Sequence, residues 1–173
     1  LAPRGDQVPR AVLAFALNML LFEDLLRRVP EGAAYIADHL RRGGKACFDH
    51  GALRTVAAPS GALPAGHAAF ARILEPLGYR VADLYPLPRI HMTGRAVAHL
   101  DLPEGIPQFF VSELHPEAFS PAFQDAVQRV LADSRDPLSP EAAAQLGHLA
   151  ERGSLALEAA RGLLLDLMPC FDR

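Results

Sequence analysis

Lysine and net positive charge are scarce in this sequence of 173 residues. Lys45 is the only lysine, and the formal net charge of the chain is −3 at pH 7. The arginines are scattered along the chain and do not gather with aromatic residues in a stripe. Proteins that bind nucleic acid usually present a concentrated positive surface to the phosphate backbone. The sequence therefore disfavours nucleic-acid binding.

Cysteine is also rare, and the two that occur, Cys47 and Cys170, lie far apart in the sequence. They form neither the dense pattern of a disulfide framework nor a CxxC motif that would bind a metal or carry out a redox reaction. Such sparse cysteine usage is typical of proteins that work in a reducing compartment. We therefore expect a cytoplasmic protein.

No hydrophobic run is long and pure enough to predict a transmembrane helix. The most apolar stretch, residues 8–26, is interrupted by Arg10, Asn18, Glu23 and Asp24, whereas a membrane span needs roughly 20 consecutive apolar residues. No cleavage site of small residues follows, as it would in a signal peptide. We predict a helix of a soluble protein here, without a membrane partner.

The overall composition is that of an ordinary globular protein, because 50% of the residues are hydrophobic and 21% are charged. A chain of this length can bury one sizeable core and is too short for two large domains. It begins with Leu1 instead of Met. This start leaves open whether the sequence is a portion of a longer protein.

Apolar periodicity and breaker residues divide the chain into helices and strands. Helices are predicted over residues 9–28, 31–42, 67–77, 121–132, 140–152 and 154–167. Strands are predicted over residues 45–56, 79–85, 92–102 and 108–114. Gly43 and Gly44 follow the second helix and supply the positive φ angle that a helix C-terminus favours.

The middle of this order is strand, helix, strand, strand, strand, which is a βαβββ unit. Such a unit is similar to the module of the vicinal oxygen chelate fold, in which two modules pair and curl their sheets around a metal. We therefore predict an α+β fold in one compact domain, with N-terminal helices over residues 1–44, the module over 45–116 and C-terminal helices over 117–173. Because one module leaves its concave sheet face exposed, we expect a second module in the same longer chain or in another subunit.

The first predicted strand carries two candidate site residues on one face. Alternate residues of a strand share a face, so one face holds Phe48, His50, Ala52 and Arg54, and the other holds Cys47, Asp49, Gly51 and Leu53. The Cα atoms of His50 and Arg54 would lie roughly 13 Å apart at ~3.3 Å per residue. Imidazole is a good ligand for iron(II), and a guanidinium presents paired donors to a carboxylate. The strand predicts either a site for a metal-bound organic acid or, alternatively, two structural or solvent-exposed side chains.

Two further residues are candidates for the same site. Glu113 lies in the last predicted strand and shares its face with Phe109 and Val111, so it is a candidate metal ligand. The alternative is that Glu113 pairs with an arginine such as Arg95. His99 could line the same concave face, or it could be a core histidine whose hydrogen bonds are satisfied.

Three segments resemble the 2-oxoadipate dioxygenase/decarboxylase, or hydroxyglutarate synthase, family. They are FDHGALRTV at residues 48–56, HMTGRAVAHLDLP at residues 91–103 and FFVSELHPE at residues 109–117. The first half of the family covers essentially the whole chain. The resemblance implies that His50 is a metal ligand and that Arg54 contacts the substrate. It also implies iron(II) held by two histidines and one glutamate, of which the second histidine and the glutamate lie in a later module that this sequence does not contain.

The function implied by this resemblance is the conversion of 2-oxoadipate and dioxygen to 2-hydroxyglutarate and carbon dioxide in lysine breakdown. The substrate would chelate the iron through its carboxylate and keto oxygens, and Arg54 would orient it. Apolar side chains would exclude water from the site, namely those of Phe48, Val97, Phe109 and Val111. No nucleotide cofactor is implied.

Two alternative functions remain open at this point. One is a different metal-dependent reaction on the same fold, such as isomerisation, ring cleavage or lyase chemistry on another oxo acid. The other is a half-module without turnover that binds a small oxo acid or an ion, or mediates dimerisation.

Overall fold

The computed structural model describes residues 5–172 and has an α+β fold. Its helices are α1 (Arg10–Arg28), α2 (Pro30–Arg41), α3 (Ala68–Leu74), α4 (Pro121–Leu131), α5 (Pro140–Arg152) and α6 (Leu157–Leu167). Its strands are β1 (Gln7–Pro9), β2 (His50–Val56), β3 (Tyr79–Leu87), β4 (Met92–His99), β5 (Gln108–Leu114) and β6 (Ser154–Ala156). Short 3₁₀ turns are η1 (Pro88–Ile90), η2 (Pro116–Ala118) and η3 (Met168–Phe171). The predicted fold class and the predicted βαβββ order are confirmed.

Four strands form the central sheet in the order β2-β5-β4-β3. β2 and β5 run parallel, and the other two pairs are antiparallel. A parallel pair needs a crossover connection, which here consists of α3 and the β3–β4 hairpin. This topology sets the first strand of the module beside its last strand, so residues about 58 positions apart become neighbours.

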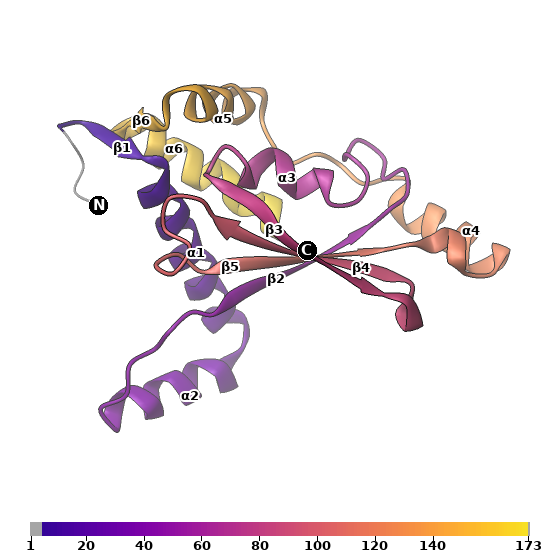
Figure 1. Ribbon diagram of the computed structural model, residues 1–173, viewed down its shortest axis with the longest axis horizontal. Coiled ribbons are helices and arrows are strands. Elements are labelled where there is room, and N and C mark those ends of the chain that lie inside the picture. The colour runs from indigo at the N-terminus through magenta and orange to yellow at the C-terminus, as the bar shows by residue number, and fades with distance from the viewer. Residues whose placement is uncertain (1–4, 173) are drawn as a thin grey trace.

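Helices cover one face of this sheet. Phe109 and Val111 of β5 are buried in the same core as Leu17 of α1, Ile73 of α3 and Leu163 of α6. Figure 1 shows α3 and α6 along one side of the sheet. In β2 every second residue is exposed, beginning with His50, so the opposite face lacks such a cover among the described residues.

A short two-stranded ladder was not anticipated from the sequence. β1 pairs antiparallel with β6 through Gln7↔Ala156, Val8↔Leu155 and Pro9↔Ser154. The predicted start of the last helix at Ser154 is wrong, because Ser154–Ala156 is extended and α6 begins at Leu157. Val8 and Leu155 are buried, so the ladder fastens the start of α1 to the start of α6.

Other predicted boundaries need small corrections. The first strand of the module starts at His50 instead of at residue 45, and β4 ends at His99 instead of at residue 102. The predicted stop after the second helix is confirmed, because Gly43 has φ = 79°. Glycine adopts this left-handed conformation without steric cost.

Helix α2 stands apart from the core. None of its residues is buried, and Tyr35 keeps 69% of its surface exposed. In Figure 1 it projects from the body of the molecule next to the segment that leads into β2.

No helix within residues 5–172 is long and apolar enough to cross a lipid bilayer.

Candidate functional site

The open face of the sheet carries both residues of the first predicted site. His50, Ala52 and Arg54 are exposed, while Thr55 is buried on the other face. The register pairs His50 with Gln108 and Arg54 with Ser112. Directly paired residues of a sheet share a face, so His50 and Arg54 lie on one surface together with their β5 partners.

The imidazole of His50 is oriented by a neighbouring carboxylate. Its Nδ1 atom lies 2.7 Å from Oδ2 of Asp49. The prediction that Asp49 points away from His50 is wrong, because β2 begins only at His50 and Asp49 precedes its regular alternation. A proton on Nδ1 that is donated to Asp49 leaves the Nε2 lone pair available, which is the arrangement commonly found for histidines that bind metals.

A small hollow adjoins His50 on the open face. It has a volume of about 210 Å³ and is lined by Asp49, His50, Tyr85, Ala96, Gln108, Phe109 and Phe110. The rings of Tyr85 and Phe110 lie 5.8 Å apart between centroids and form its aromatic wall. The hollow therefore combines the polar side chains of Asp49, His50 and Gln108 with an aromatic wall.

A second hollow, of about 250 Å³, lies between α1 and residues 47–51. Phe48 packs edge-on against Phe22 of α1, with 4.3 Å between the ring centroids. Phe48 thus packs against helix α1, whereas its predicted role was to shield a substrate from water.

Arg54 is held by a hydroxyl group and not by an acid. Its Nη1 atom donates to Oγ of Ser112 over 2.5 Å. Among residues 5–172, no carboxylate lies within ion-pair distance of its guanidinium. Because a charged group of this kind binds carboxylates through paired N–H donors, Arg54 is suited to an acidic ligand.

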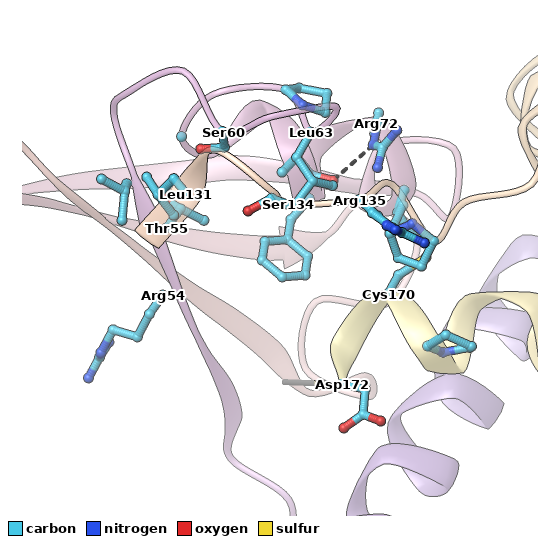
Figure 2. Close-up of a pocket in the computed structure, with 18 residues that line it drawn as sticks. Arg54, Thr55, Ser60, Leu63, Arg72, Leu131, Ser134, Arg135, Cys170 and Asp172 are labelled. Atoms are coloured by element: carbon cyan, nitrogen blue, oxygen red, sulfur yellow. Dashed lines mark hydrogen bonds between the residues drawn. The ribbon is translucent and has the colours of Figure 1, made fainter. Parts of the chain in front are cut away.

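Arg54 also borders a large cavity, of about 590 Å³, between the β2–α3 connection, α3, residues 131–137 and the C-terminal turn. Figure 2 shows the Arg54 side chain directed away from Arg72 and Arg135. Arg72 makes two hydrogen bonds to the Asp136 carboxylate, at 2.5 and 2.7 Å. This pairing lowers the pKa of Asp136, which therefore stays ionised. The charge of Arg72 is thus already balanced by Asp136 in the wall of this cavity.

Glu113 lies on the helix-covered face, opposite to His50. It pairs in register with Thr55, and its Oε1 lies 3.0 Å from Arg95 Nη2. Its Oε2 accepts the backbone N–H of His67 at 2.7 Å. Burial would raise the pKa of Glu113, but the His67 N–H and the Arg95 guanidinium outweigh it, so the pKa is lowered. The structure does not bring Glu113 together with His50, and the alternative pairing with Arg95 is the one observed.

His99 takes the alternative role that the sequence allowed, that of a core histidine. It is buried, its Nε2 lies 3.0 Å from the Leu77 carbonyl, and its Nδ1 accepts the backbone N–H groups of Asp101 and Leu102. Burial lowers the pKa of His99, which favours the neutral imidazole. His99 is therefore not part of the open-face site.

The predicted apolar shield is wrong for two residues. Val97 and Val111 are buried in the core beneath the helices and line neither hollow beside His50, whereas Phe109 is buried in the same core and also lines both hollows. Phe110, which the sequence reasoning passed over, lies on the open face with Tyr85. The deep burial of Phe109 and Val111 follows from their alternation with Phe110, a signal that was present in the sequence.

The described residues fit the role of one metal ligand, not of a complete metal site. No group of three histidine, cysteine, aspartate or glutamate residues within 5–172 is arranged to hold a metal ion. His50 offers a suitably oriented nitrogen donor, and the carboxylate of Asp49 beside it is engaged with Nδ1. A site with three such ligands would therefore need at least one residue from outside this part of the chain.

A family model described as 2-oxoadipate dioxygenase/decarboxylase matches residues 22–172. No curated protein matches the chain.

Solved structures match along nearly the whole chain. A protein assigned to the glyoxalase superfamily from Ralstonia eutropha JMP134 is 54% identical over 100% of this chain and 54% of its own length, with a TM-score of 0.96. The hydroxyglutarate synthase from Pseudomonas putida is 19% identical over 97% of this chain and 43% of its own, with a TM-score of 0.63. The hydroxyglutarate synthase from Oryza sativa, solved with 2-oxoadipate, is 19% identical over 94% and 50%, with a TM-score of 0.60. The chain thus spans about half the length of these structures.

Proposed function

Because the chain belongs to the 2-oxoadipate dioxygenase/decarboxylase family, we propose that it supplies one half of an iron(II)-dependent enzyme acting on 2-oxoadipate. The proposed reaction converts one 2-oxoadipate and one dioxygen to one 2-hydroxyglutarate and one carbon dioxide. The substrate loses its C1 carboxylate as carbon dioxide, and both atoms of dioxygen end in the 2-hydroxyglutarate. The proposed setting is lysine breakdown in the cytoplasm, whose reducing conditions suit two free cysteines.

The observation that carries the proposal is the shared placement of His50 and Arg54. Both lie on the open face of β2, and both fall within the matched residues 22–172. His50 presents an imidazole oriented by Asp49, and Arg54 presents a guanidinium without an acidic partner among the described residues. An oxo acid needs a metal ligand at its keto end and a cation at a carboxylate, and one strand offers both.

The roles of the side chains follow from their contacts. His50 would donate its Nε2 lone pair to iron(II), while its Nδ1–H group donates a hydrogen bond to the Asp49 carboxylate. Arg54 would orient the substrate through a carboxylate. Tyr85 and Phe110 would keep water from the hollow beside His50. When bound, iron(II) supplies the dioxygen chemistry itself.

The remaining ligands belong to a part of the enzyme beyond the described residues. The chain spans about half of its solved relatives, and its sheet keeps one face open. A second βαβββ module, in the same longer chain or in another subunit, would cover this face and complete the iron site with a histidine and a glutamate.

A turnover assay tests this proposal. The native polypeptide that contains these residues is loaded with iron(II) and given 2-oxoadipate in aerated buffer. We expect equal amounts of dioxygen consumed, carbon dioxide released and 2-hydroxyglutarate formed. We expect His50→Ala to abolish all three, and the control variant His148→Ala, at an exposed position of α5, to leave them unchanged. A folded, iron-loaded protein that consumes no dioxygen would refute the proposed reaction.

One observation favours a second candidate, a half-module that binds an oxo acid without turnover. Within residues 5–172, no three metal-ligating side chains come together. In that case the native polypeptide would bind 2-oxoadipate and retain no iron after desalting. Metal analysis by mass spectrometry separates the two candidates, because only the enzyme should retain about one iron per site.

A further inference from the structure

Ser112 and Arg54 are direct partners across the parallel strands β5 and β2. Although its side chain is on the open face, Ser112 has only 2% of its surface exposed. Its other neighbour in register is Gly94 of β4. A Cβ atom at Gly94 would lie 2.3 Å from Cζ of Phe110, so the Phe110 ring occupies that space. Arg54 and Phe110 thus flank a buried hydroxyl.

The hydroxyl of Ser112 acts both as a hydrogen-bond donor and as a hydrogen-bond acceptor. It donates to the carbonyl oxygen of Leu53 at 3.2 Å and accepts from Nη1 of Arg54 at 2.5 Å. A serine hydroxyl has a single proton, so the bond to Leu53 turns an oxygen lone pair toward the guanidinium. The backbone at Ser112 is fixed as well, because its carbonyl accepts from Oγ1 of Thr55 at 3.1 Å.

This contact leaves most of the arginine available. A guanidinium has five N–H donors, and Ser112 takes one of them on Nη1. The edge formed by Nε and Nη2 keeps its paired donors, the geometry that binds a carboxylate through two parallel hydrogen bonds. A long side chain that is ordered before binding loses less conformational entropy when the ligand arrives.

We propose that Ser112 is a positioning residue, which holds the Arg54 guanidinium in place so that its Nε–Nη2 edge receives a carboxylate of the oxo acid. This inference rests on the proposed function for the identity of the acid. Ser112 itself touches no substrate and acts through Arg54. By keeping the Arg54 side chain ordered, Ser112 raises the affinity for dicarboxylic oxo acids.

The first test measures the order of Arg54 without any ligand. Heteronuclear ¹⁵N relaxation of the Arg54 Nε–H group should show a restricted side chain in the unmodified polypeptide and a mobile one in Ser112→Ala. Thr55→Val is the matched control, because it removes a hydroxyl that bonds to the Ser112 backbone from the other face, and it should leave Arg54 restricted. Equal mobility in Ser112→Ala and the unmodified protein overturns the inference, whatever the ligand.

The second test is a double-mutant cycle on binding of 2-oxoadipate, measured by calorimetry. We expect Ser112→Ala to raise the Kd by about two- to tenfold, because the ligand must then order an Arg54 side chain that was free before binding. In an Arg54→Met background the same change should have no further effect, because a residue that acts through Arg54 has nothing left to position. If Ser112→Ala is unstable, Ser112→Cys keeps the side-chain volume with a weak acceptor and takes its place.

The outcomes of the two tests are distinguishable. Equal Kd values for the unmodified protein and Ser112→Ala, or the same loss in both backgrounds, contradict positioning through Arg54. An unmodified protein that binds no 2-oxoadipate refutes the proposed function, and with it the identity of the acid in this inference. A mobile Arg54 in Ser112→Ala supports the hydrogen bond as the cause of its order in either case.

Discussion

Arg54 owes its suitability for an acidic ligand to geometry as much as to charge. Its guanidinium is exposed on the sheet and fixed at one end by Ser112. Arginine presents a planar fork to a carboxylate, whereas lysine presents a compact point charge on a flexible stem. The fork, and not the charge alone, should therefore determine affinity.

Arg54→Lys should weaken 2-oxoadipate binding about tenfold although the charge is kept, because one hydrogen bond of a bidentate pair is lost. Titration calorimetry measures the Kd. The matched control is Arg135→Lys in the large cavity, which should bind normally. Unchanged affinity in Arg54→Lys, combined with a loss in Arg135→Lys, would place the acid in the large cavity instead.

Asp49 should matter for metal binding although it need not touch the metal. Asp49→Asn removes the charged acceptor of the His50 Nδ1 proton, and loss of such a partner typically lowers metal affinity about 10- to 100-fold. Because the Asp49 side chain is 95% exposed, we expect the lower end of this range. Competition titration with a metal indicator gives the affinity, with Asp133→Asn as the control. If Asp49→Asn and Asp133→Asn bind the metal with the same affinity, Asp49 does not contribute to the metal site.

Glu113 should contribute to stability and to its dependence on pH. Its pKa is lowered from 4.5 in the folded chain, so its stabilising effect is complete above pH 4.5 and is lost as the pH falls through the folded value. Glu113→Gln should lower the free energy of unfolding at pH 7 by about 2 kcal/mol, because Arg95 loses its charged partner. It should also flatten the decline of stability in acid.

Urea denaturation at several pH values between 3 and 7 tests this expectation. Glu151→Gln, at an exposed position of α5, is the control and should change little. A Glu113→Gln protein as stable as the control, with the same acid profile, would show that the Arg95 pair does not stabilise the fold.

At the scale of elements, α6 shows how one helix divides its leucines between core and solvent. Leu163 is fully buried and Leu165 is 70% exposed. Leu163→Ala should lower the free energy of unfolding by about 2–5 kcal/mol, whereas Leu165→Ala should stay within about 0.5 kcal/mol of the unmodified protein. Chemical denaturation measures both. Similar effects of the two changes would contradict the burial of one face of α6 in the core.

Most helices and strands were predictable because their signals are local. Apolar periodicity and breaker residues gave α1, α5 and β5 with ends within about one residue of those observed. The β1–β6 ladder was not predicted because its two three-residue strands lie far apart in the sequence, and only their pairing makes them strands. Short extended segments carry too little local preference to be recognised alone.

The part of the site that depends on local signals was also predictable from the sequence. Alternation within one strand placed His50 and Arg54 on a common face, which needs no knowledge of neighbouring strands. Whether Glu113 joins them depends on the register between β2 and β5, and the sequence does not encode that register locally. The observed pairing of Arg54 with Ser112 puts Glu113 on the far face. A one-residue shift of register would have reversed this result.

At the scale of the whole molecule, the sheet has a helix-covered face and an open face, and only the open face carries His50 and Arg54. Tyr85 of β3 pairs with Gly94, lies on the open face and keeps 44% of its surface exposed. Exposed apolar surface of this kind often marks a contact with another protein surface. The open face is therefore where a second module would complete the site.

A crystal structure of the native polypeptide with iron(II) and 2-oxoadipate, prepared without dioxygen, tests the central claim most directly. We expect iron bound to His50 Nε2, with the oxo acid beside it and one of its carboxylates on the Nε–Nη2 edge of Arg54. Iron or 2-oxoadipate bound elsewhere, for example in the large cavity near Arg135, with His50 and Arg54 free of both, would contradict the claim.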